Sequence, residues 1–174
     1  MKEIEKTNNW YGSTFISRPY IDLVDKSKSA ETFAKLKQLW EEKDLLIVEG
    51  ALTRSGVGND LFANAQSIKR IVCPSKNSYQ QIGQIEQAIR DNAENRLILL
   101  MLGPTAKVIV DDLQDLSNQM IDIGHIDSEY EWFKMGATYK VKLANKHTAE
   151  FNYDEDISAV HDQIYQDEIV ARIE

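Results

Sequence analysis

Residues 45–62 read LLIVEGALTRSGVGNDLF, the most informative stretch of the chain for predicting its fold. Its first five residues, four of them aliphatic, predict a buried strand, and the loop that follows carries three glycines and an arginine. Asn59 and Asp60 close the loop with side chains that favour the start of a helix. Glycine lets backbone N–H groups approach an anion closely, and a helix N-terminus favours negative charge. The stretch therefore predicts an anion site, with the candidate residues Gly50, Arg54, Gly56, Gly58, Asn59 and Asp60.

Short apolar runs alternate with helical periods along the rest of the chain. Strands are predicted at 69–73, 97–102 and 120–123, in addition to the one at 45–49. The run at 97–102 is apolar at every position, which is typical of a strand covered on both faces of a parallel sheet. The alternation predicts one α/β domain over residues 1–174, with a Rossmann-like, doubly wound and mainly parallel sheet.

Helices are expected between these strands. A helix before the first strand places Phe33, Leu36 and Trp40 on one face, and a short helix is predicted over residues 60–67. Helical spacing continues from Tyr79 to Ile89. Another helix begins at Pro104, because proline is tolerated in the first turn.

Two elements are predicted in the last part of the chain. Residues 138–143 alternate between apolar and polar side chains, which predicts an edge strand. Apolar spacing through residues 157–165 predicts a last helix.

Polar groups follow the predicted strands at one edge of the sheet. Ligands of doubly wound sheets bind outside the carboxyl ends of the strands. Besides the glycine-rich loop, the chain places there Ser75, the turn Gly103, Pro104 and Thr105, and the turn that holds His125, Asp127 and Glu129. We expect the loops after the first, third and fourth strands to form one pocket. Ser75 either contacts a phosphate or caps a helix.

His125, Asp127 and Glu129 stand at positions i, i+2 and i+4 and are the candidates for catalysis. On an irregular turn they converge on a divalent cation, with His125 and Asp127 as the metal ligands, and the carboxylates favour Mg²⁺ or Mn²⁺. The alternative is the start of a helix, with Asp127 as its cap and Glu129 beside the positive end of the helix dipole. The residues alone leave both interpretations open.

Charge and cysteine content limit the partners and the compartment. Twenty basic and 28 acidic residues give a formal net charge of −8, which argues against nucleic acid as a partner. A single cysteine excludes an intramolecular disulfide, and no segment has the layout of a signal peptide. We therefore expect a cytoplasmic protein and leave peripheral membrane contact open.

Several ordered motifs then resemble one known family. They are Phe15 to Tyr20, Ile47 to Gly50, Arg54 to Phe62, Leu102 to Ala106, and Asp122 to Trp132. Together they resemble the GT-D fold glycosyltransferases of Gram-positive bacteria, over about residues 15–146. Those enzymes extend glycans on serine-rich adhesins or make cell-surface polysaccharide.

The resemblance implies a Rossmann-like sugar transferase that takes a UDP-sugar, often UDP-glucose, with a divalent metal (Mn²⁺ or Mg²⁺) and a glycan or glycoprotein acceptor. It implies that Arg18 and Glu49 join the glycine-rich loop, Ser75 and residues 103–105 at the donor site. It also implies metal or catalytic work for His125, Asp127 and Glu129.

Members of the family carry an Asp-Gly-Glu metal motif upstream of the matched region, and the sequence given begins after that point. We therefore expect either a shortened enzyme or a catalytically incomplete, nucleotide-sugar-binding or scaffold subunit of a split enzyme. A homodimer or a partner chain that carries the motif would cover Trp10, Tyr11 and Phe15. A third interpretation is a nicotinamide-binding domain, although Leu61 breaks the glycine fingerprint that begins at Gly56.

Overall fold

The structure, a computed structural model, describes residues 15–151, 156–159 and 161–174. Within these residues one sheet holds five strands, all parallel, in the order β4-β3-β1-β2-β5. The strands are β1 (Asp44–Gly50), β2 (Ser67–Cys73), β3 (Leu97–Met101), β4 (Met120–Asp122) and β5 (Ile169–Arg172). The predicted doubly wound α/β fold is confirmed.

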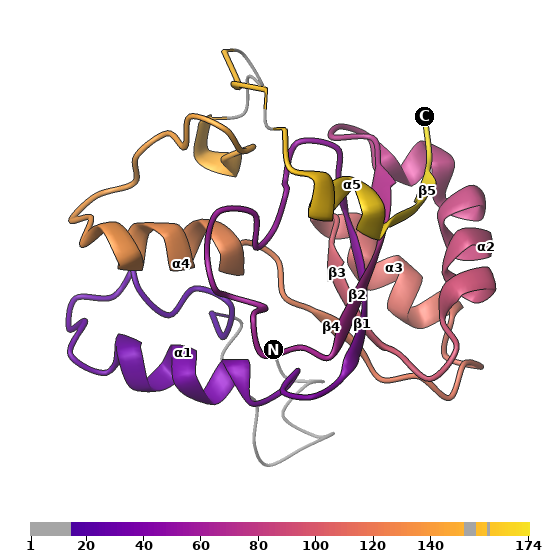
Figure 1. The fold of residues 1–174 in the computed structure, drawn as a ribbon, viewed down its shortest axis with the longest axis horizontal. Coiled ribbons are helices and arrows are strands. Elements are labelled where there is room, and N and C mark those ends of the chain that lie inside the picture. The colour runs from indigo at the N-terminus through magenta and orange to yellow at the C-terminus, as the bar shows by residue number, and fades with distance from the viewer. Residues whose placement is uncertain (1–14, 152–155, 160) are drawn as a thin grey trace, which may run out of the picture.

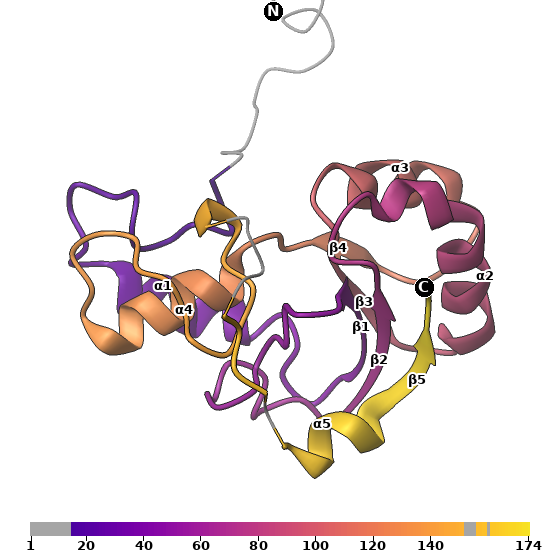
Figure 2. The ribbon, with the colours of Figure 1, turned by 90° about the horizontal axis from the view of Figure 1, so that it is seen from above.

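Helices cover both faces of the sheet (Figures 1 and 2). On one face lie α1 (Ser29–Lys37) and α4 (Ile126–Met135), and on the other lie α2 (Ile82–Asn92) and α3 (Pro104–Asp112). A last helix, α5 (Gln163–Glu168), leads into β5 at the edge of the sheet. Single 3₁₀ turns, η2 (Ser78–Gln81) and η3 (Ala149–Phe151), precede α2 and follow α4.

Strand β1 lies at the centre of two cores. Leu45 and Ile47 belong to the cluster that includes α1 and α4, whereas Leu46 and Val48 belong to the cluster that includes α2 and α3. Successive residues of a strand face opposite sides of the sheet. Because helices cover both sides, all four side chains are fully buried. This burial explains the uninterrupted apolar run in the sequence.

The strand order creates a crevice at one edge of the sheet. The chain passes from β1 to β2 on one side, and β3 then pairs with β1 on the other side. Connections that leave β1 and β3 therefore diverge, and ligands of such sheets bind at this switch point.

The helix predicted over residues 60–67 is absent, and turns take its place. The Asn59 side chain accepts the N–H of Leu61 (2.9 Å), while the Leu61 carbonyl accepts the indole N–H of Trp40 (3.0 Å). The N–H and carbonyl groups of Leu61 are thus bonded to side chains and do not take part in the backbone hydrogen bonds of a helix. The prediction of a helix N-terminus at Asn59 and Asp60 is therefore wrong.

The last part of the chain also differs from the prediction. Residues 138–143 form no strand, since the carbonyl of Val141 accepts the indole N–H of Trp132 (2.9 Å) and this segment lies beside α4. The sheet edge is taken instead by β5, which was not predicted. The predicted last helix is confined to α5.

No helix in the described residues is long and apolar enough to cross a membrane. Of the aromatic residues expected at an interface, Phe15 is 57% exposed, while Trp10 and Tyr11 lie outside the described residues.

Two glycines of the loop after β1 offer a matched test of its packing. Both have left-handed backbones, with φ of 80° at Gly56 and 77° at Gly58. A Cβ at Gly56 would lie 2.8 Å from the Phe62 ring, whereas at Gly58 it would meet nothing within 4 Å. We expect Gly58→Ala to cost about 1 kcal/mol from backbone strain, and Gly56→Ala about 1–3 kcal/mol more from the clash. Urea denaturation of the two variants measures the difference, and equal losses would contradict it.

Candidate functional site

A cleft of about 450 Å³ lies at the carboxyl edge of the sheet. It is lined by the segments after β2 and β3, the start of α4 and the turn before η3. Its lining residues are Ser75, Asn77, Ser78, Tyr79, Leu102, Gly103, Pro104, Thr105, His125, His147 and Ala149. Five of the predicted site residues lie here: Ser75, Gly103, Pro104, Thr105 and His125.

The N-terminus of α3 opens at this cleft. Gly103 precedes the helix with a φ of 56°, a backbone that favours glycine, and Pro104 occupies the first helical position as predicted. The buried hydroxyls of Ser78 and Thr105 lie 3.2 Å apart and join the segment after β2 to this helix start. Pro104 has no N–H, and the N–H of Ala106 donates to the Gly103 carbonyl (3.2 Å), so the N–H of Thr105 is the donor that this helix start can offer an anion.

Tyr79 is a lining residue that the sequence placed on a buried helical face. The structure puts it in the 3₁₀ turn η2 after Asn77, whose backbone is left-handed, so its side chain is 58% exposed. An exposed aromatic ring that lines a cleft can stack on a nucleobase.

His125 stands immediately before α4 and receives a hydrogen bond from the segment that precedes α1. The guanidinium Nη2 of Arg18 lies 2.7 Å from its Nδ1. Burial, together with the charge of Arg18, lowers the pKa of His125 below its ordinary value of 6.5. The imidazole is therefore neutral at pH 7.

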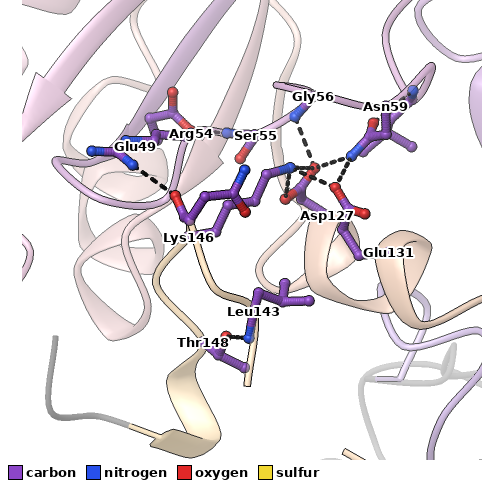
Figure 3. A network of polar contacts seen from close by, with 12 residues as sticks. Glu49, Arg54, Ser55, Gly56, Asn59, Asp127, Glu131, Leu143, Lys146 and Thr148 are labelled. Atoms are coloured by element: carbon purple, nitrogen blue, oxygen red, sulfur yellow. Dashed lines mark hydrogen bonds and ion pairs between the residues drawn. The ribbon is translucent and has the colours of Figure 1, made fainter. Parts of the chain in front are cut away.

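Asp127 points to the glycine-rich loop and to the segment after α4 (Figure 3). Its carboxylate accepts the backbone N–H of Gly56 (2.8 Å) and the side-chain amide of Asn59 (3.0 Å), and it pairs with the ammonium of Lys146 (2.9 Å). Lys146 also pairs with Glu131 (2.8 Å) and is only 1% exposed. The network joins three segments of the chain.

Glu129 lies on another side of α4. Its Oε2 accepts the backbone N–H groups of Tyr20 and Ile21, each at 2.9 Å. Burial raises the pKa of this carboxyl, although the two backbone hydrogen bonds oppose the shift. Glu129 thus holds the segment before α1 against α4.

The three predicted metal or catalytic residues therefore do not converge. Successive residues of a helix are rotated by about 100°, so His125 and Glu129 share a face while Asp127 points away from it. The described residues contain no group of three or more His, Cys, Asp or Glu that could hold a metal ion. The structure thus does not bring the three predicted residues together. They stand at a helix start, as in the alternative, but the N-cap is His125, and Asp127 does not cap the helix because its carboxylate binds Gly56, Asn59 and Lys146.

The polar groups of the glycine-rich loop are engaged within the protein. Arg54 donates to the carbonyls of Asn145 (2.7 Å) and Ser158 (2.9 Å). Glu49 accepts the Ser55 N–H (2.8 Å) and pairs with the buried Arg70 (2.8 Å).

Asp60 pairs with Lys37 on α1 (3.0 Å) and with Lys134 on α4 (3.1 Å). Gly50 lies where a Cβ would approach Thr53 and Ser75 to 3.3–3.4 Å, so a close approach of two loops explains this glycine.

The expected pocket is consequently divided. Gly56, Gly58 and Asn59 line a second groove of about 510 Å³, whose other wall is formed by α5. Arg18, Glu49, Gly50, Arg54 and Asp60 line neither hollow. The loop that follows β1 ties the structure together, and the cleft is formed by the loops after β2, β3 and β4.

Two residues of this region, Lys146 and His147, were not predicted to take part in the site. Lys146 reads as a surface lysine, and His147, which lines the cleft, had no recognisable partner in the sequence. Both lie in an irregular segment that is fixed where the N–H of His147 donates to the Leu52 carbonyl (2.6 Å).

Comparisons with known proteins agree with this geometry. The model of the glycosyltransferase GT-D fold matches residues 1–151. A relative from Streptococcus gordonii, named "Probable glycosyl transferase Gly", is 66% identical over 164 residues, which are 94% of this chain and 24% of the relative. Glycosyltransferase GlyD of Streptococcus pneumoniae serotype 4 is 59% identical over 96% of this chain and 20% of the relative. The chain thus spans a quarter or less of these curated relatives.

Solved structures are similar over nearly the whole chain. A structure of the domain of unknown function 1792, described as having a distinct glycosyltransferase fold, superposes with a TM-score of 0.93 at 67% identity. It covers 97% of this chain and 61% of that one. A structure described as a new glycosyltransferase from Streptococcus sanguinis has the same TM-score at 62% identity, over 99% of this chain and 65% of that one.

The Lys146 network predicts a large loss of stability. Lys146→Met leaves the carboxylate of Asp127 buried without its cation, and we expect a loss of about 3–5 kcal/mol in the free energy of unfolding. Lys146→Met combined with Asp127→Asn should recover much of it, because the unpaired charge is gone. Lys134→Met, which removes a cation that is half exposed, should change stability by about 0.5 kcal/mol or less. Urea denaturation measures all three, and no recovery in the double variant would contradict the pairing.

The lowered pKa of His125 predicts a pH dependence of stability. As pH falls below about 6.5, the unfolded chain binds a proton at this residue that the folded chain does not, so folding stability decreases. We expect His125→Gln to flatten the decrease between about pH 7 and pH 5 relative to the unchanged protein. His161→Gln, at an exposed histidine, is the control, and urea midpoints across this range are the measurement. An equal slope with and without His125 would refute the assignment.

Proposed function

The chain belongs to the GT-D fold glycosyltransferase family, and on that premise we propose that the cleft at the carboxyl edge binds the UDP part of a UDP-sugar donor. The single observation that carries this proposal is the cleft itself, which lies at the carboxyl edge of the sheet and opens at the N-terminus of α3. In this position an anion meets the positive end of the helix dipole and the N–H of Thr105.

Different lining residues bind different parts of the donor. The N–H of Thr105 at the start of α3 and the hydroxyl of Ser75 bind the pyrophosphate. Tyr79 stacks on the uracil, because it is exposed and lies at the same cleft. His125 lines the same cleft at the start of α4, and an N–H there would stabilise the charge that develops on UDP as it leaves.

The reaction proposed for the family member is transfer of the sugar from UDP to a glycan or glycoprotein hydroxyl. The divalent metal that the family resemblance implies does not fit the described side chains, since Asp127 is neutralised by Lys146 and Glu129 is bound to backbone N–H groups. No step of the proposal therefore runs through a metal.

Donor binding without turnover by this chain alone is the second candidate. This second candidate is favoured by the structural contacts of Asp127 and Glu129, which occupy the carboxylates that catalysis would need. Release of free sugar from a UDP-sugar distinguishes the two candidates: release supports transfer, and binding without release supports the second.

The proposed UDP site can be tested by thermal unfolding. We expect millimolar UDP to raise the melting temperature by several degrees in the presence of EDTA, because a ligand present at about 100 times its Kd stabilises by about 2.7 kcal/mol. The same measurement with Mn²⁺ determines whether a metal adds to this effect, and with NAD it tests the nicotinamide alternative. No shift with UDP in either condition would overturn the proposal.

The stacking role of Tyr79 has a matched control in the chain. Tyr79→Ala should weaken UDP binding about tenfold, since stacking of a base on an aromatic ring contributes about 1–3 kcal/mol. Tyr139→Ala removes a tyrosine that is 71% exposed and lies outside the cleft, so UDP affinity should not change. Isothermal titration calorimetry measures both, and equal affinities of the two variants would rule out the stack.

A further inference from the structure

The segment before α1 lies along one face of α4 and contacts it at two levels. At the first level Arg18 reaches His125, and one helical turn later Tyr20 and Ile21 reach Glu129. Residues four apart on a helix share a face, so His125 and Glu129 both face the segment before α1. Their two contacts with this segment determine the position of Arg18 relative to α4.

The contact at Glu129 is the buried one. The residue is 1% exposed, and a single carboxylate oxygen accepts two successive backbone N–H groups at 2.9 Å each. Hydrogen bonds to a charged acceptor are stronger than those between neutral groups. This carboxylate therefore fixes the backbone directly after Pro19, and with it the path of Arg18.

The contact at His125 determines which ring nitrogen carries the proton. A guanidinium has N–H donors and no acceptor, so at 2.7 Å the Nδ1 of His125 must be the acceptor. In a neutral imidazole the proton then lies on Nε2. His125 lines the cleft, so the ring nitrogen left for a ligand is an N–H donor.

The charges around Arg18 hold the guanidinium in place. Asp22 lies 3.1 Å and Glu150 3.6 Å from it, and Lys140 pairs with the same two carboxylates at 3.0 and 3.4 Å. Of these groups only Arg18 is within hydrogen-bond distance of the His125 ring. Lys140 is thus a cation of the same cluster that lacks the contact with the imidazole.

We propose that Glu129 is a positioning residue, which through the backbone of Tyr20 and Ile21 holds Arg18 on Nδ1 of His125 and so presents His125 to the donor as an Nε2–H group. The inference deepens the proposed function and rests on it for the identity of the ligand. The arrangement of Glu129, Arg18 and His125 does not depend on that identity.

The tautomer of His125 tests this arrangement without any ligand. Imidazole ¹⁵N chemical shifts, recorded on the full chain at pH 8, distinguish the two neutral tautomers, and His125→Gln assigns the signal. We expect the Nε2–H form in the unchanged protein and in Lys140→Met. We expect a mixture of tautomers in Arg18→Met and in Glu129→Met, whereas Glu129→Gln, whose amide oxygen still accepts both N–H groups, should retain the Nε2–H form.

Three results would overturn the proposal: the Nδ1–H form in the unchanged protein, an unchanged tautomer in Glu129→Met, or a mixture in Lys140→Met. If Glu129→Met does not fold, Arg18→Met carries the test, because the Arg18 side chain is partly exposed. An unchanged tautomer in that variant then overturns the proposal.

UDP titration links the tautomer to the ligand. We expect Glu129→Met and Arg18→Met to weaken UDP binding about tenfold, and Lys140→Met and Glu129→Gln to leave it within twofold. If the tautomer responds as expected but no protein binds UDP, the positioning is supported and the proposed donor is refuted. If UDP binds equally to all variants while the tautomer changes, His125 does not donate to this ligand and the proposal is refuted.

Discussion

The arrangement of the site depends on the ion pair between the buried carboxylate of Asp127 and the ammonium of Lys146. An unpaired charge in this position would cost several kcal/mol, so the fold must supply partners. They come from three places: the ammonium of Lys146, the N–H of Gly56 and the amide of Asn59. Matching one charge therefore fixes the loop after β1 and the irregular segment after α4 against the same helix. It also uses donors that an anion would need, which is why a loop with the composition of an anion site serves as a structural tie.

Three polar side chains at the start of α4 contact three different parts of the protein. His125 stays at the cleft, Asp127 turns to the glycine-rich loop, and Glu129 holds the segment before α1. A spacing of two residues on a helix separates side chains by about 200°, whereas a spacing of four returns them to one face. On an irregular turn the i, i+2, i+4 pattern can bring all three side chains to one metal ion, whereas on a helix the middle side chain points away from the other two.

The fold was predictable where burial leaves a local pattern. The apolar runs in β1 and β3 reflect strands covered on both faces, and their order along the chain predicts a parallel sheet. Strand β5 was not predictable, because it is only four residues long and its residues 169–171 are all apolar although Val170 is exposed, so the sequence shows no alternation. Its pairing depends on the free edge of β2. The helix expected after Asn59 failed for a related reason: the Trp40 indole takes the Leu61 carbonyl, and no local propensity reports that contact. The pairing of Lys146 with Asp127 joins an irregular segment to a helix and becomes visible only in the fold.

The charge of the molecule limits how an anion can be held. The chain has a formal net charge of −8, and no Lys or Arg is among the residues that line the cleft in the described structure. In the proposed donor site the favourable groups are therefore dipoles: the N–H of Thr105 at the start of α3, hydroxyls and the neutral imidazole of His125. Arg18 contributes its charge from behind that imidazole, where it also selects the tautomer. Dipoles bind an anion well only if they are already aligned, because each one is weaker than a full charge. A site of this kind must be rigid, and the buried carboxylates of Asp127 and Glu129 provide the rigidity.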